Sequence, residues 1–333
     1  MKKYLSEILE NEEFTTDIFL VSAIEKIAKT GKKYITGEVL DKTLKLKFNL
    51  WNIENRTLEK NCYYSFTGKL EKYNNSFQIN LFKFSKKNEK NIDLLDFKKS
   101  TDLNIENLYN DLLNILSAIK DPFYKFLADE IFVKNEDFIK NFKNSPAAEK
   151  VHGAYIGGLL EHSVNIAKMA EILVNFYNEF YFFGKLSKDL TVIGSLLHDI
   201  GKMWEYDYHG ALIKTTKKGE LLGHIYMSSN LINDLANKYK AKFPDCDIDE
   251  KLIKLIHLVL SHHGKLEFGA PVVPKIPEAI IVYHLDNIDA KMINFLSNTK
   301  NAVEEFTDRN FVHENARLYN IFLDEKRRIN YES

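Results

Sequence analysis

The segment SLLHDIGK, residues 195–202, places an imidazole and a carboxylate side by side behind two leucines. His198 and Asp199 therefore project into one small region at the last turn of an apolar helical pattern. There the carboxylate can bridge two metal ions while the imidazole holds one. Gly201 is expected to let the chain turn away, and Lys202 is then placed to meet a phosphate oxygen. We expect Asp199 and Lys202 to be catalytic residues.

Further imidazoles and carboxylates lie in or beside apolar helical patterns, which carry them toward a helix-packed interior. They are His162, His224, His262, His263 and Asp286. Burying these groups without partners would cost several kcal/mol apiece. A bound metal removes that cost, and neutral imidazole with carboxylate is a ligand set for Mn²⁺, Fe²⁺ and Zn²⁺. No suitable cysteine lies nearby, which excludes a thiolate zinc site. Spacing does not decide between His262 and His263 as the direct ligand.

The order of these residues, His162, then the His198–Asp199 pair, then Asp286, resembles the H…HD…D pattern of the HD-domain phosphohydrolase superfamily. The additional histidines resemble the subset that binds two metals. Several longer segments are, together with the strand-rich front of the chain, similar to the YhaM-type 3′-5′ exoribonucleases. They are PAAEKVHGAYIGGLLEHS, GELLGHI, SHHGKLEFGAPVVPKIPEA and YHLDNIDAKM.

This resemblance implies a site of two divalent ions, with Mn²⁺ as the first choice and Fe²⁺, Co²⁺ or Mg²⁺ as alternatives. The implied metal ligands are His162, His198, Asp199, His224, His262, His263 and Asp286. Asp289 lies one helical turn after Asp286 and is a candidate to orient a ligand or the substrate. Two positions depart from the family pattern: Gly153 stands where a second histidine is expected, and Leu44 where a glycine is expected. The first departure leaves only a supporting role for His152 in view.

The chain between residues 16 and 85 reads as five short strands, which fits a barrel of the OB type. In the third, Leu44, Leu46, Phe48 and Leu50 share one face, and Lys45, Lys47, Asn49 and Trp51 share the other. Lysines beside an outward tryptophan would let bases stack next to phosphate contacts. The alternative is that Trp51 packs under a loop and the lysines only solubilise the face. The nucleic-acid-binding candidates are Lys33, Tyr34, Lys45, Lys47, Trp51 and Phe77.

Charge is distributed unevenly along the 333 residues. Residues 31–100 hold 15 Lys+Arg and 8 Asp+Glu, a net charge of +7, and the rest of the chain must carry −8 to give the total of −1. A basic front segment can attract a polyanion, although a solvated lysine-rich surface would give the same count. No apolar run approaches the roughly 20 residues that span a bilayer, and no secretory signal is seen. With two distant cysteines, a cytoplasmic protein without a membrane partner is expected.

The apolar period becomes helical after residue 100, and Asp121–Pro122 is a helix-start signal. Residues 86–100 are polar and look like a linker. The expected fold is multidomain: an N-terminal all-β OB-type barrel at 1–97 (core 16–85), a linker with connecting helices at 98–145, and an all-α HD-type metal-dependent phosphohydrolase domain at 146–333.

We therefore expect a metal-dependent 3′-5′ exoribonuclease that hydrolyses single-stranded RNA, with single-stranded DNA as a second substrate, to nucleoside 5′-monophosphates. The family resemblance supplies the 3′-5′ direction. Two alternatives stay open: an HD phosphohydrolase for free nucleotides or cyclic dinucleotides, and a non-catalytic RNA-binding protein with structural metal. Homo-oligomerisation also stays open.

Overall fold

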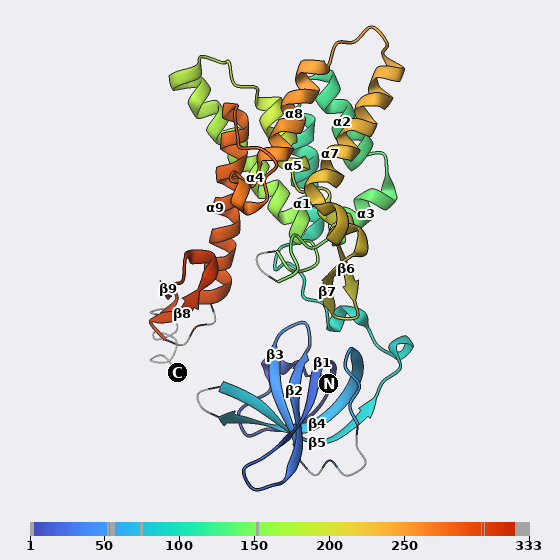
Figure 1. Cartoon of the computed structure of the whole chain (residues 1–333), viewed down its shortest axis with the longest axis vertical. Coiled ribbons are helices and arrows are strands. Elements are labelled where there is room, and N and C mark those ends of the chain that lie inside the picture. The colour runs from blue at the N-terminus through green and yellow to red at the C-terminus, as the bar shows by residue number, and fades with distance from the viewer. Residues whose placement is uncertain are drawn as a thin grey trace. The chain divides into compact units, whose positions relative to one another are not determined.

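The computed structural model describes residues 3–51, 53, 57–73, 76–150, 153–300, 302 and 304–323. The chain forms two compact units (Figure 1). The barrel unit comprises residues 1–100 together with 208–214, and the helical unit comprises 101–207 and 215–333. The two units are described separately below.

The barrel unit is a closed five-stranded barrel with strand order β1-β2-β3-β5-β4. Its strands are β1 (Glu13–Ile27), β2 (Lys33–Leu40), β3 (Lys45–Trp51), β4 (Cys62–Tyr73) and β5 (Ser76–Lys86). Strands β3 and β5 pair in parallel and close the barrel, while the other pairs are antiparallel. This order and closure confirm the predicted OB-type architecture.

The alternation in β3 explains how the barrel separates its core from its surface. Phe48 and Leu50 are fully buried with side chains from the other strands, whereas Lys45, Lys47 and Trp51 are exposed. Because successive side chains of a strand point to opposite faces, the predicted alternation is confirmed within β3. Leu44, which was predicted to share the core face, precedes β3 and is 40% exposed.

Residues 86–100 do not form the expected linker. They contain two short 3-10 helices, Glu89–Asn91 and Leu94–Asp96, each capped by an Asn or Asp side chain. Phe97 is buried against Phe19 and Tyr63. The polar composition of residues 86–100 did not predict that this segment packs on the barrel, because a single buried aromatic ring is enough to anchor a short segment.

The helical unit contains α1 (Ile105–Ser117), α2 (Pro122–Phe132), α3 (Glu136–Asn144), α4 (Gly158–Tyr177), α5 (Lys188–Leu197), α6 (Lys202–Glu205), α7 (Lys217–Lys242), α8 (Asp249–Ser261) and α9 (Pro277–Thr299). A π-helical turn, Asn178–Phe182, follows α4. The side chain of Asp121 accepts hydrogen bonds from the amides of Phe123 and Tyr124, which confirms the predicted start of α2. Helices α4 and α5 lie at the centre of a core made by apolar faces of α1, α2, α7 and α8.

Two hairpins interrupt the helices. The first pairs β6 (Tyr206–His209) with β7 (Leu212–Thr215), and its residues 208–214 group with the barrel unit. The second, β8 (Phe306–Asn310) with β9 (Ala316–Tyr319), lies in a region expected to be helical. Among the described residues, none of the helices has the length and apolarity to cross a membrane.

Candidate metal centre

The centre is built around the junction of α5 and α6. The side chain of Ser187 caps the start of α5, which ends at Leu197, so that His198 takes the C-cap position and Asp199 follows directly. Both side chains are at most 1% exposed. Gly201, which was expected to let the chain turn away, precedes the short helix α6. It has an ordinary helical conformation, and a Cβ there would lie 2.2 Å from the carbonyl oxygen of His224, so glycine permits this close approach.

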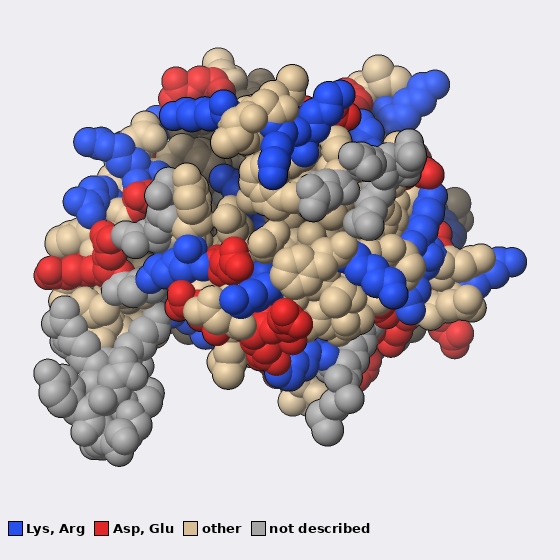
Figure 2. Space-filling view, turned by 90° about the horizontal axis from the view of Figure 1, so that it is seen from below, with Lys and Arg blue, Asp and Glu red and all other residues tan. Residues whose placement is uncertain are grey.

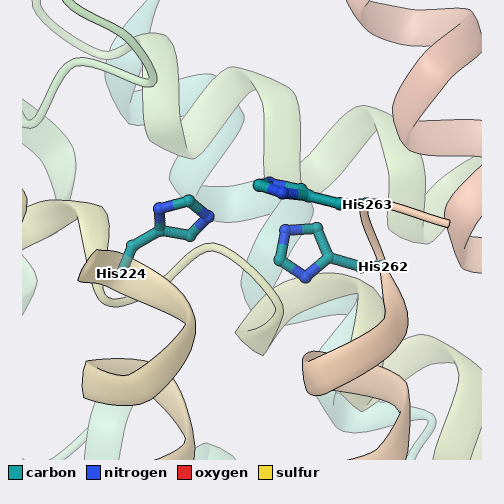
Figure 3. A group of neighbouring side chains, drawn as sticks. All are labelled: His224, His262 and His263. Atoms are coloured by element: carbon teal, nitrogen blue, oxygen red, sulfur yellow. The ribbon is translucent and has the colours of Figure 1, made fainter. Parts of the chain in front are cut away.

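All seven candidate ligand residues converge here from five segments of the helical unit. They form two adjacent groups, one of His162, His198, Asp199 and Asp286 and one of His224, His262 and His263. Within each group, the ligand atoms lie within 4.8 Å of one another. Figure 3 shows the rings of the second group turned toward one another, with His224 from α7 and the other two just beyond the end of α8.

Each of the five imidazoles is fixed from behind by an acceptor at its Nδ1 atom. The acceptors are Asp289 Oδ2 for His162 (2.7 Å), Ser195 O for His198 (2.8 Å), Glu205 Oε2 for His224 (2.9 Å), Val259 O for His262 (2.7 Å) and Phe268 O for His263 (2.8 Å). An acceptor at Nδ1 requires the proton there, so Nε2 becomes the ligating atom.

The Nε2 atoms surround the carboxylate of Asp199. Those of His198 and His162 lie 3.3 and 3.5 Å from its Oδ2, and those of His224 and His262 lie 3.3 and 3.4 Å from its Oδ1. The Nε2 atoms of His198, His224 and His262 and the Oδ1 atom of Asp199 are buried without a hydrogen-bond partner among the described residues. Unpaired buried polar atoms that converge on one point fit a divalent ion.

The charges of the two groups differ. Burial disfavours the imidazolium form of His162, but Asp199, Asp286 and Asp289 outweigh burial and hold its pKa well above the ordinary value. Burial lowers the pKa of His262, and burial followed by the neighbouring His262 lowers that of His263. Burial therefore favours the neutral imidazole form of His262 and His263, the protonation state that metal binding needs.

Lys202 lies inside the centre. Its Nζ atom is 2.6 Å from Oδ2 of Asp199, and the residue is 9% exposed. Burial opposes the charged form of the lysine, but Asp199 and Asp286 raise its pKa above the ordinary value. Against the opposing effect of burial, Lys202 and then His198 hold the pKa of Asp199 well below its ordinary range. The sequence placed Lys202 near the metals, and the structure adds this ion pair.

The structure places one of the two supporting residues that the sequence named. Asp289 contacts His162 and accepts a hydrogen bond from Asn165 (3.2 Å). His152 lies outside the described residues. Sequence reasoning missed Asn165 and Glu205, which hold no ligand position themselves. Glu205 follows Lys202 by one helical turn, and this spacing is the weak sequence signal that could have indicated it.

Comparison with known proteins agrees with this reading of the helical unit. The family model for the HD domain matches residues 159–291. That range contains every residue of both groups. The chain thus combines an OB-type barrel with a helical HD-type domain, an arrangement that supports a metal-dependent phosphohydrolase in general terms.

Two solved structures resemble the barrel. The second OB-fold domain of replication protein A from Methanococcus maripaludis is 20% identical, covers 28% of this chain and 100% of its own, and gives a TM-score of 0.23. An OB domain from Methanosarcina mazei is 23% identical, covers 26% of this chain and 84% of its own, and gives a TM-score of 0.24. The OB-type assignment itself rests on the strand order and closure described above.

The six barrel candidates are not equivalent in the structure. Tyr34 and Trp51 are direct cross-strand partners, and their rings stack with centroids 4.6 Å apart and an interplanar angle of 22°. Lys33 is paired with Glu25 (2.9 Å) and Lys45 with Glu38 (2.7 Å). Lys47 is exposed and forms no ion pair among the described residues, because Glu38, which lies opposite it on β2, binds Lys45 instead.

Phe77 is exposed but shares its alternation with the buried Ile79 and Leu81, so it belongs at the barrel rim rather than beside Trp51. The end of β1 and the turn that follows it carry three further lysines that were not among the candidates, Lys26, Lys29 and Lys32, in the basic run KIAKTGKK. On the face shown in Figure 2, basic and acidic side chains are interspersed. The stacked aromatic pair is therefore a more specific feature of the barrel than its charge.

Proposed function

We propose that this protein is a metal-dependent 3′-5′ exoribonuclease that hydrolyses single-stranded RNA to nucleoside 5′-monophosphates, with Mn²⁺ as its metal. The observation that carries the proposal is the convergence of five imidazole Nε2 atoms and two carboxylates in the HD-type unit. The same chain carries an OB-type barrel with an exposed aromatic pair. A phosphohydrolase for mononucleotides would not need such an extended surface.

The proposed metal ligands are the seven residues of the two groups, because their ligand atoms converge and those of His198, Asp199, His224 and His262 are buried without a hydrogen-bond partner among the described residues. Bound ions would supply Lewis acidity and a water of lowered pKa, the chemistry that two-metal phosphodiesterases use. The chain's own part is to hold this site in place. Asp199 lies between the two groups with both oxygens within 3.5 Å of imidazole nitrogens, and its position suits a carboxylate shared by two ions.

Lys202 is the proposed electrostatic catalyst. An ammonium group has three donors on a compact charge, and one of them is directed at Asp199. The remaining donors suit a phosphoryl oxygen on which negative charge develops in the transition state. The lysine is buried beside the ligands, so solvent screens its charge less than it screens an exposed lysine.

The barrel is the proposed site for the single strand. The Tyr34–Trp51 pair leaves Trp51 40% exposed, which is enough ring surface for a base to stack on. Lys47 lies four residues before Trp51 on the same face of β3, and it would contact the phosphate backbone. Stacking of this kind needs unpaired bases, which accounts for the single-strand preference.

A substrate panel tests the function. Purified full-length protein with Mn²⁺ is given single-stranded RNA, single-stranded DNA, double-stranded RNA, free nucleotides and a cyclic dinucleotide, with the Asp199→Asn variant as the matched control. We expect 5′-monophosphates from the single strands, RNA first, and no product from the variant. Turnover of free or cyclic nucleotides with intact RNA would instead establish an HD phosphohydrolase of small substrates. Binding without turnover of any substrate would establish an RNA-binding protein with structural metal.

A further inference from the structure

Glu205 holds His224 at two points. Its Oε2 atom lies 2.9 Å from Nδ1 of the imidazole, and its Oε1 atom accepts a hydrogen bond from the backbone amide of His224 at 3.1 Å. Glu205 is 8% exposed, so both contacts are shielded from solvent. A carboxylate that binds both the ring nitrogen and the backbone amide of one histidine fixes the position of that residue and the orientation of its ring.

The local chain enforces this contact. Glu205 ends α6, and its carbonyl oxygen accepts a hydrogen bond from Thr216, the N-cap of α7 (2.8 Å). The helix then breaks at Gly223, whose φ of +70° and ψ of 155° lie in a positive-φ region that is essentially restricted to glycine. This break sets His224 at the start of a new helical run, above Glu205. Gly223 and the N-cap residue Thr216 thus both help to position the imidazole of His224.

The second group depends on this contact more than the first group depends on any single partner. His162, His198, Asp199 and Asp286 include two carboxylates, whereas His224, His262 and His263 include none. In the second group, backbone carbonyls hold the other two imidazoles at Nδ1, and Glu205 supplies the one carboxylate bound at an Nδ1 atom. A carboxylate behind a ligating imidazole fixes its tautomer and raises its basicity.

We propose that Glu205 is a positioning residue that controls binding of a divalent ion at the His224–His262–His263 group. It acts through His224 and touches neither substrate nor metal. The proposal takes from the proposed function only the assignment of these histidines as metal ligands. The proposal concerns the ion at this group, and an ion held by His162, His198, Asp199 and Asp286 should not depend on Glu205.

Metal titration of the full-length protein tests this without any substrate. Metal-free wild-type, Glu205→Gln and Glu220→Gln proteins are titrated with Mn²⁺ by calorimetry, and bound metal is counted after desalting. Glu220 is the matched control because it is an exposed glutamate four residues before His224, and its side chain forms no hydrogen bond or ion pair with the described residues of either group. We expect two ions in wild type and control, and in Glu205→Gln a loss of about 10–100-fold in affinity for one ion only, the range for partners behind metal ligands.

Glu205→Asp keeps the charge but shortens the reach, and it serves if Glu205→Gln fails to fold. It should also weaken one ion selectively, and Co²⁺ absorption should report the altered ligand geometry in either variant. Two unchanged affinities in a folded Glu205 variant would overturn the proposal, as would equal weakening of both ions or a wild-type protein that binds fewer than two. If selective weakening is seen but RNA is not hydrolysed, the exoribonuclease proposal fails and the role of Glu205 stands.

Discussion

Asp289 lies directly behind His162, with Oδ2 2.7 Å from Nδ1, while Asp286, one turn earlier on α9, lies 3.2 Å from Nε2 of the same ring. A single helix therefore holds the imidazole between two carboxylates. Asn165, one turn after His162 on α4, donates to the other oxygen of Asp289 and fixes that carboxylate in turn. The ring is positioned before any ion binds.

This arrangement predicts a supporting role for Asp289. Replacing it by asparagine should lower Mn²⁺ affinity by about 10–100-fold, because the hydrogen bond that orients His162 is weakened while the ligands remain. Calorimetry on the metal-free protein measures this, with the exposed Asp234→Asn as control. Affinity equal to that of the control would show that Asp289 only fills space in the core.

Lys202 separates catalysis from metal binding. If it stabilises charge on the phosphoryl group, Lys202→Ala should lower single-turnover hydrolysis by about 10²–10³ with metal content unchanged. Lys217→Ala, an exposed lysine at the start of α7, is the control. If bound metal falls together with the rate, the lysine acts by holding Asp199, to which it is paired at 2.6 Å. A rate within two- or threefold of wild type would remove the catalytic role.

The stacked pair on the barrel should carry affinity for single strands and not chemistry. Trp51→Ala and Tyr34→Ala should each weaken binding of single-stranded RNA by about 1–3 kcal/mol, the cost of losing one stacked base. Hydrolysis of a small phosphodiester such as bis-p-nitrophenyl phosphate should be unchanged. Phe311→Ala removes an even more exposed ring, in the helical unit, and should leave RNA affinity intact. Unchanged RNA affinity in both barrel variants would rule out the pair as the platform.

Two neighbouring lysines should differ in their contribution to RNA binding. Lys45 already pairs with Glu38, so a phosphate must compete with that carboxylate, whereas Lys47 has no acidic partner among the described residues. Lys47→Ala should therefore reduce the slope of log affinity against log salt by about 0.7, the value for one contact to a single strand. Lys45→Ala should reduce it less. Fluorescence anisotropy over a salt series gives both slopes, and the reverse order would contradict the assignment.

The parts of this structure that follow a regular spacing of apolar residues could be predicted from the sequence. The alternation in residues 43–51 predicted which side of β3 faces the barrel core, and the helical pattern around His198 predicted that its imidazole would be buried. Residue type then indicated which buried groups could share a metal. These inferences need only local order along the chain.

Features that depend on tertiary contacts were not predictable in this way. Whether His262 or His263 lies deeper depends on where the chain leaves α8, and the structure places His262 at the C-cap, buried and 3.4 Å from Asp199, with His263 beside it. Glu205 could not be assigned because its partner is 19 residues away across a hairpin. Phe97 could not be distinguished from a linker residue because the rings that bury it come from other strands.

The most direct test of the central claim, 3′-5′ hydrolysis at this metal centre, is a time course on one single-stranded RNA labelled separately at either end. With Mn²⁺, we expect the 5′-labelled strand to shorten in single-nucleotide steps, and the 3′-labelled strand to release labelled 5′-monophosphate as its first product. Asp199→Asn should do neither. Release of labelled mononucleotide from the 5′ end, internal cuts that ignore the 3′ end, or unchanged activity in Asp199→Asn would contradict the claim.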